Sequence, residues 1–413
     1  MALSDVLAAL LAPHGRAGAP TPWRWLICLV TLPLFVGAFS YTTDILPAYV
    51  ATKAWPFLML PLAAFGYATL RLPARATYAV TLCYIVSVPP VMAMAYLGSS
   101  FTEAILISIK LLPLGFYFAL PEAVALLRID APTLRSAVVR LGQFTFALML
   151  VLWVVVPASA YRSEFGIDTV FIGGDPTRGD RIQMPMCFGL LFIFKLGHDL
   201  ARGRRLLDAA LLVLCFVLLL TIYKERIPIV FSLLIVLLAF FTRLLRSRLM
   251  ALATLAVLGA AAATLVLLLL GGDRVAQALG DSLNVRIDTT VRAWDFIRDD
   301  PLRWLFGVGS TTKYAAVTIN TLFRDPAFFL ADIGWLGVVF EAGLLGALPI
   351  LALHLASLAI AQSCATPEDS VSMALADYAL YVLAASVVYS PTLLPGEIAT
   401  VTALAVIFRR FRK

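Results

Sequence analysis

Long apolar stretches, separated by short groups of charged and turn-forming residues, recur along the whole chain. A helix needs about 20 mostly apolar residues to cross the hydrocarbon core of a membrane. On that basis the pattern predicts twelve membrane-spanning helices. They are expected at residues 24–40, 54–70, 76–97, 104–127, 138–160, 184–200, 206–223, 227–242, 250–270, 328–362, 371–390 and 393–408. The stretch 328–362 is long enough for a tilted helix or for a helix broken near Gly343 and Gly346.

The composition leads to the same class of protein. Of the 413 residues, 61% are hydrophobic and only 14% are charged. Soluble chains are usually about a quarter charged and under half apolar, so the excess of apolar side chains has to face lipid. This excludes a soluble enzyme, a secreted protein and a nucleic-acid-binding protein. The predicted fold class is an all-α polytopic membrane protein.

The positions of Lys and Arg set the expected orientation, because cytoplasmic loops are rich in these residues. With the N-terminus inside, almost every short inner loop carries arginines, and both termini are cytoplasmic. The chain then divides into a nine-helix part (1–270), a large outer loop (271–327) and a three-helix part (328–413).

Several basic residues fall on the outer side, against that preference. Outer loop 161–183 and the short turn 223–226 contain a charged group made of Arg162, Arg178, Arg181, Lys224, Glu225 and Arg226. Long loops cross a membrane whatever their charge, which is one explanation of the loop. An anionic ligand at the outer membrane–water boundary is the other, and it also explains the short turn.

The large outer loop contains a predicted amphipathic helix at residues 283–299. Its apolar residues recur at helical spacing and are Leu283, Ile287, Val291, Trp294 and Ile297. We expect this helix to lie on the membrane surface or to pack against the bundle. Arg286 and Arg292 occupy its other faces. The later turn Gly307-Val308-Gly309 is either a simple turn or a place where backbone amides approach a phosphate.

Charged residues also fall within the apolar runs. Asp332 is expected about two turns inside the span that begins at residue 328. A carboxylate at such depth usually faces a cavity or a partner, so Asp332 is either functional or ion-paired with a nearby arginine. Lys110 and Glu341 either line a polar cavity or pair with other helices.

Three features, in this order, resemble the bacterial O-antigen and exopolysaccharide polymerases (Wzy type), which share a superfamily with the O-antigen ligases. The first is Lys224-Glu225-Arg226 at the outer start of a span. The second is Arg286, followed by Pro301 and then by Gly307-Val308-Gly309. The third is Asp332 at the opening of the next span, before a glycine-rich stretch. The resemblance covers roughly residues 220–350.

The resemblance implies a glycosyltransferase of the bacterial inner membrane, with its active site facing the periplasm. Its substrates would be oligosaccharide repeat units linked to undecaprenyl diphosphate, and its other partners would be membrane lipid and, as an option, a chain-length regulator protein. Arginine suits a diphosphate leaving group because its donor fork is always charged. The predicted catalytic residues are therefore Arg226 and Arg286, with Asp332 accepting the proton of the acceptor hydroxyl and Glu225 as second candidate.

The predicted substrate-binding residues are Lys224, Glu225, Arg292, Arg178, Arg181, Gly307 and Gly309. No metal ion or other cofactor is predicted, because the expected outer side has no Asp-x-Asp pair and no His/Cys cluster.

Two other functions stay open at this stage. An O-antigen ligase would pass the glycan to lipid A–core, and the resemblance leads us to expect a histidine near Asp332 in such an enzyme. The histidines are His14, His198 and His354, and the latter two are expected near the inner side or within a span. A lipid-linked glycan transporter would show two similar halves with interrupted helices. The sequence shows neither a histidine expected near Asp332 nor such a repeat. Both the ligase and the transporter therefore rank below a polymerase.

Overall fold

The computed structural model describes residues 22–40, 45–161, 171–175, 179–203, 206–270, 281–311, 317–325, 328–392 and 394–411. The first group of described helices is α2 (Pro22–Phe35), α3 (Leu46–Thr69), α4 (Arg75–Leu97), α5 (Phe101–Ile109), α6 (Phe116–Leu126) and α7 (Ala131–Val155). A short hairpin follows, made of β1 (Ile172–Asp175) and β2 (Gly179–Ile182). The next helices are α8 (Cys187–Ala201), α9 (Leu206–Leu218), α10 (Arg226–Leu245) and α11 (Arg248–Leu270). The last group is α13 (Asp281–Arg298), α14 (Pro301–Phe306), α15 (Ile319–Phe323), α16 (Gly334–Cys364), α17 (Ser370–Ala385) and α18 (Pro395–Arg410).

Apolar helices of membrane-spanning length confirm the predicted class, an all-α membrane protein. In the described part of the chain, six segments are long and apolar enough to cross a membrane: α3, α4, α7, α9 with the π-helical turn that extends it to Tyr223, α10 and α16. A seventh span is possible if α5 and the segment Leu112–Leu126, bent by 43°, cross together. The predicted count of twelve and the predicted division of the chain stay predictions.

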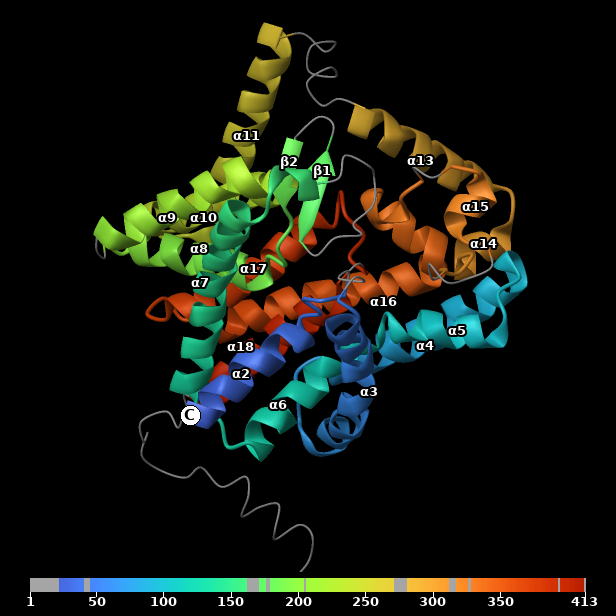
Figure 1. Ribbon diagram of the computed structural model, residues 1–413, viewed down its shortest axis with the longest axis horizontal. Helices are drawn as coiled ribbons and strands as arrows, with labels where there is room; N and C mark the ends of the chain where they lie inside the picture. The colour runs from blue at the N-terminus through green and yellow to red at the C-terminus, as the bar shows by residue number, and fades with distance from the viewer. Residues whose placement is uncertain are drawn as a thin grey trace, which may run out of the picture.

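Two mostly buried helices form the centre of the bundle. In α18 nearly all side chains from Pro395 to Phe408 are buried, and the helix packs against α16, α6 and α17. Its middle, Ala-Thr-Val-Thr-Ala-Leu-Ala-Val, is rich in small residues that allow neighbouring helices to approach closely. In α8 most residues are also buried, against α17, α7 and α10. Figure 1 shows α16 and α18 crossing the middle of the molecule, and α11 projecting away from it.

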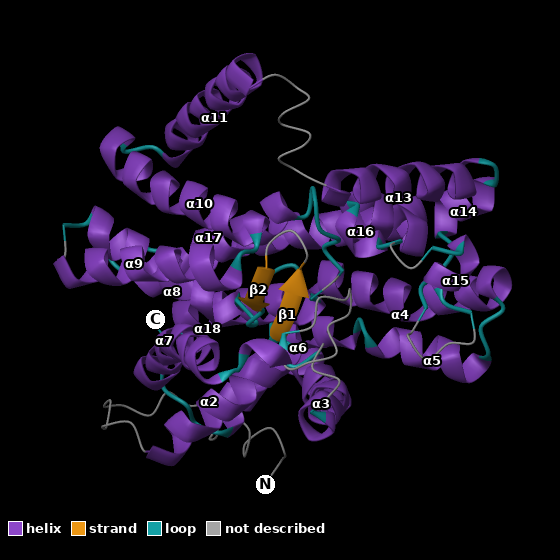
Figure 2. Ribbon diagram, turned by 45° about the horizontal axis from the view of Figure 1, so that its top comes forward, coloured by secondary structure: helices purple, strands orange, loops and turns teal. Residues whose placement is uncertain are grey.

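The segments after α11 form a smaller second core. Its buried apolar residues come from α13, from the turn after α14, from α15 and from the segment before α16, and they pack onto α4, α5 and α16, as Val308 and Phe340 do. Figure 2 shows α13, α14 and α15 gathered at one side of the molecule beside α4 and α5. The loop predicted as one large outer segment is therefore anchored to helices from both halves of the chain.

The structure differs from the predicted boundaries at two charged residues. Lys53, expected in a loop, lies within α3, and Asp332, expected two turns inside a span, lies in a 3₁₀ turn before α16 begins at Gly334. The two differences have separate causes. A charge inside an apolar run, such as Lys53, does not end a helix, because the side chain can reach a polar environment, whereas Gly334 with φ +55° interrupts the run that contains Asp332.

Candidate functional site

Arg286, Asp332 and Tyr389 meet although they come from three distant segments. Arg286 lies in the second turn of α13, and its Nη2 is 3.9 Å from Oδ2 of Asp332. The same guanidinium lies over the ring of Tyr389, 5.7 Å from its centroid. The ion pair predicted as one explanation of Asp332 is therefore present. Tyr389 follows α17 in the chain and was not predicted as a site residue.

Glu225 collects three hydrogen-bond donors beside this group. Its Oε1 accepts from Nη1 of Arg181 at 2.9 Å and from Nε2 of Gln183 at 3.2 Å. Its Oε2 accepts a long hydrogen bond from the Tyr389 hydroxyl at 3.5 Å. Tyr389 thus links the two charged pairs. We refer to Arg181, Glu225, Tyr389, Arg286 and Asp332 as the arginine–carboxylate cluster.

The local backbone explains how Glu225 reaches this position. Lys224 has a left-handed conformation, φ 56°, which ends the π-helical turn after α9 and lets α10 start in a new direction. The Lys224 Nζ donates to the backbone carbonyl of Asp180 at 2.7 Å and lies 5.5 Å from the ring centroid of Trp153. Lys224, predicted to bind substrate, therefore holds the hairpin against the bundle.

Tyr389 is a neutral donor within the cluster. Burial raises its pKa to about 12, and the negative charges of Glu225 and Asp332 act in the same direction. At neutral pH the hydroxyl therefore stays protonated and can donate a hydrogen bond to Glu225. No sequence motif marks this tyrosine, since it is set apart only by its place in the turn between α17 and α18.

Each arginine of the cluster retains a buried donor that is not used. The Nε atoms of Arg181 and Arg286 are shielded from solvent and have no hydrogen-bond partner among the described residues. Buried polar groups are nearly always hydrogen-bonded, but the Nε atoms of Arg24, Arg135, Arg248 and Arg303 are in the same state, so this feature alone does not distinguish the cluster. An anionic oxygen is the kind of ligand that would satisfy such donors.

The remaining predicted arginines lie outside the cluster. Arg226 is exposed at the first position of α10. Arg292 lies further along α13 and forms ion pairs with Asp288 at 2.9 Å and with Asp325 at 3.2 Å, which connects α13 to the end of α15. Arg178 lies outside the described residues.

Close packing against neighbouring backbone explains why positions 307 and 309 are glycines. Helix α16 is interrupted at Gly343, with φ 67° and ψ 179°, so the predicted break is present. The turn after α14 fits into this break, and the amides of Val308 and Gly309 donate to the carbonyls of Phe340 and Glu341. A Cβ on Gly307 would lie 2.6 Å from the amide nitrogen of Ala342. These amides already have acceptors, so the phosphate-binding interpretation has no geometric support.

The described residues contain no group of three or more His, Cys, Asp or Glu side chains arranged to hold a metal ion. The histidines in the described ranges have other partners: His198 lies 2.6 Å from Asp377, and His354 lies 2.8 Å from the carbonyl of Ile350. Neither belongs to the arginine–carboxylate cluster.

Neither models of known protein families nor curated protein sequences give a match to this chain.

Proposed function

We propose that the protein is a polysaccharide polymerase, a glycosyltransferase that joins oligosaccharide repeat units carried on undecaprenyl diphosphate. The proposed setting is the periplasmic side of a bacterial inner membrane. The observation that carries the proposal is the arginine–carboxylate cluster, which combines two guanidinium groups with two carboxylates. Transfer from a diphosphate to a hydroxyl needs both kinds of group. The order of these residues along the chain also resembles that of the polymerases.

Arg286 and Arg181 are the proposed partners of the diphosphate. As the anomeric bond of the donor sugar breaks, the electron pair goes to the diphosphate oxygen, and negative charge grows there. Preorganised donors aimed at such charge lower the barrier by several kcal/mol. The unused Nε donors of both arginines suit this role. Arg226, predicted as catalytic, follows Glu225 at the start of α10 and stays a candidate for the same role.

Asp332 is the proposed base. The acceptor hydroxyl oxygen forms the new bond to the anomeric carbon, and its proton passes to the carboxylate. The Asp332 side chain is 36% exposed, whereas that of Glu225 is 18% exposed and already accepts three hydrogen bonds. Glu225 therefore fits the role of a positioning residue, which holds Arg181 and Tyr389 in place.

The experiment uses the full-length protein in lipid, with the undecaprenyl-diphosphate-linked repeat unit of the source strain. Products are sized on a gel, with and without lipid A–core. We expect a ladder from the repeat unit alone, reduced at least 100-fold in Arg286→Gln. The matched control is Arg298→Gln on the same helix, because Arg298 is more exposed and its ion-pair partners among the described residues are Asp295 and Asp299. The Arg298→Gln variant should still produce the ladder.

The other outcomes identify the competing functions. Transfer that requires lipid A–core would indicate a ligase, and the role given to Asp332 would be wrong. An intact substrate that crosses the membrane without forming a new glycosidic bond would indicate a transporter.

A further inference from the structure

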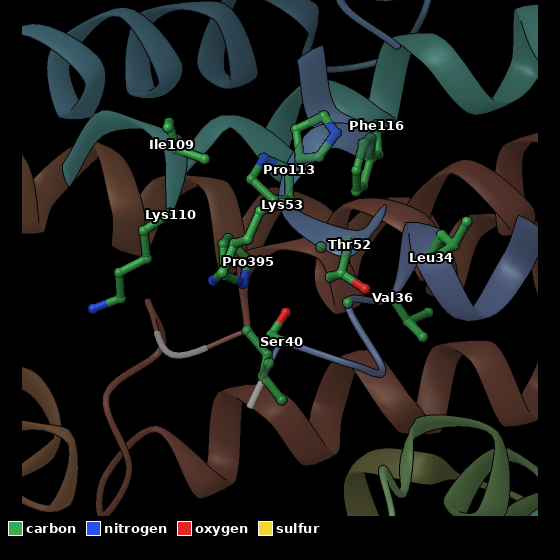
Figure 3. A pocket seen from close by; sticks show the side chains of 14 residues that line it. Leu34, Val36, Ser40, Thr52, Lys53, Ile109, Lys110, Pro113, Phe116 and Pro395 are labelled. Atoms are coloured by element: carbon green, nitrogen blue, oxygen red, sulfur yellow. The ribbon is translucent and has the colours of Figure 1, made fainter. Parts of the chain in front are cut away.

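A second polar site lies between helices, in a cavity of about 120 Å³ that shares no residue with the arginine–carboxylate cluster. Its walls come from the end of α2, from α3, from the bend between α5 and α6, and from the start of α18. Figure 3 shows Lys53 and Lys110 at this cavity together with Thr52 and Ser40. Two lysines therefore line a space that is otherwise mostly apolar.

The charged side chains that the structure describes around the cavity do not balance. Lys110 forms an ion pair with Glu341, with Nζ 3.6 Å from Oε1, and the same oxygen accepts a hydrogen bond from Ser310 at 2.8 Å. Lys53 has no carboxylate within ion-pair distance among the described residues, and its Nζ lies 5.4 Å from the ring centroid of Tyr49. Within the described parts of the chain, one carboxylate thus faces two ammonium groups, although the Lys110 side chain is 38% exposed. Excess charge shielded from water is costly unless a counter-ion is bound.

An unused hydroxyl group lies in the same wall. Thr52 is 5% exposed, and its Oγ1 has no hydrogen-bond partner within the described parts of the chain. Threonines in membrane helices usually bond to the carbonyl four residues earlier, as Thr69 and Thr81 do here. Thr52 lines the cavity beside Lys53 instead. A buried, unused donor next to an uncompensated ammonium group indicates a bound anion.

We propose that this cavity binds the phosphate group of an anionic membrane lipid through Lys53, Lys110 and the Thr52 hydroxyl. The ammonium groups supply point charges, which phosphate accepts in any direction, and the hydroxyl supplies a neutral donor. The apolar part of the wall, with Leu34, Val36 and Phe116, suits the glycerol and upper acyl region of a lipid. This proposal does not rest on the polymerase activity.

The site requires that Lys53 points into the cavity. The other possibility is that its flexible chain extends to the membrane surface, as lysines near helix ends often do. Binding measurements distinguish these two orientations of Lys53, because lipid affinity depends on both Lys53 and Thr52 only if Lys53 points into the cavity.

The test counts lipids bound to the full-length protein by native mass spectrometry from detergent. Phosphatidylglycerol is compared with a diacylglycerol of the same acyl chains, which lacks the phosphate. We expect one phosphatidylglycerol bound, with affinity at least about tenfold lower in Lys53→Gln and about threefold lower in Thr52→Val. The latter variant keeps the side-chain shape, so it remains informative if Lys53→Gln folds poorly.

Matched controls locate the effect. Arg71→Gln removes an exposed charge outside the cavity and should leave binding unchanged. Inorganic phosphate that displaces the lipid, with the same dependence on Lys53 and Thr52, would show that the phosphate group alone is recognised. Equal binding of diacylglycerol, or equal phosphatidylglycerol affinity in all variants, would overturn the proposal.

Discussion

Nη1 of Arg181 donates to Oε1 of Glu225 at 2.9 Å, and this contact joins the β1–β2 hairpin to the residue that precedes α10. The two side chains are only 16% and 18% exposed. A charge pair that is this shielded holds its two elements together, whereas an exposed pair contributes little.

Arg181→Gln is therefore expected to lower the free energy of unfolding by about 1–3 kcal/mol, because Glu225 loses its charged donor while shielded from solvent. The measurement is denaturant or thermal unfolding of the purified protein in detergent. Arg298→Gln serves as the reference, since Arg298 is 56% exposed and should change stability by less than about 0.5 kcal/mol. Equal effects of the two substitutions would contradict this account of the hairpin.

A second prediction concerns the glycine turn. In Gly307→Ala the new Cβ would press on the backbone of α16 at Ala342, and φ at Gly307 is +80°. We expect a loss of about 1–3 kcal/mol from the backbone conformation, because φ +80° with ψ −175° is essentially restricted to glycine, and a further 1–3 kcal/mol from overpacking. Gly98→Ala is the reference without overpacking, because Gly98 has the milder left-handed conformation, φ 65° and ψ 20°, and nothing within 4 Å of a Cβ. It should lose only about 1–2 kcal/mol.

The comparison between these two glycines also separates packing from ligand binding. If Gly307→Ala were as stable as Gly98→Ala but had lost substrate binding, the turn would act on the ligand and the packing explanation would be wrong.

The sequence was sufficient for the class of fold and for several members of the cluster. Periodicity located the helix that carries Arg286, charge on the expected outer side pointed to Arg181 and Glu225, and a carboxylate within an apolar run pointed to Asp332. Apolar runs predict membrane-spanning helices because the lipid environment requires an apolar, internally hydrogen-bonded segment along the whole span. The broken α16 could be anticipated from its length and its glycines.

The sequence could not show which charges meet. Tyr389 connects Glu225 to Arg286, yet its only distinction in the chain is its position in a turn. For the amphipathic helix, the sequence predicted an apolar stripe but not which residues of the stripe would be buried against the bundle. In the structure Ala293 and Ile297 are buried, while Ile287, Val291 and Trp294 stay exposed. Such facts depend on contacts between residues far apart in sequence.

Asp300 provides a prediction about pH. Its carboxylate caps α14 by accepting from the amide of Leu302 at 2.9 Å, and this hydrogen bond is the main cause of the lowered pKa of Asp300. A lowered pKa stabilises the fold at pH values above the ordinary carboxyl value of 3.8, and that contribution disappears as the pH falls through the lower folded-state value.

Asp300→Asn keeps a side-chain oxygen for the cap but does not titrate. The difference in unfolding temperature between the natural protein and Asp300→Asn is therefore expected to favour the natural protein at pH 6 and to shrink as the pH is lowered below 3.8. A difference that stayed constant across this range would mean that the charge of Asp300 does not contribute.

The exposed stripe of α13 gives the last prediction. Ile287, Val291 and Trp294 are each about half exposed, and Trp294 packs edge-on against Trp304 at a centroid distance of 5.1 Å. Tryptophan favours the membrane–water boundary, and an amphipathic helix with arginines on its other faces lies in that plane. We expect lipids brominated near the headgroup to quench part of the tryptophan fluorescence of the protein in bilayers. Trp294→Phe should remove most of that part, whereas Trp55→Phe, at a residue packed against Phe35, should not. If lipids brominated near the chain ends quench equally well, or if Trp294→Phe has no effect, the stripe does not lie on the membrane surface.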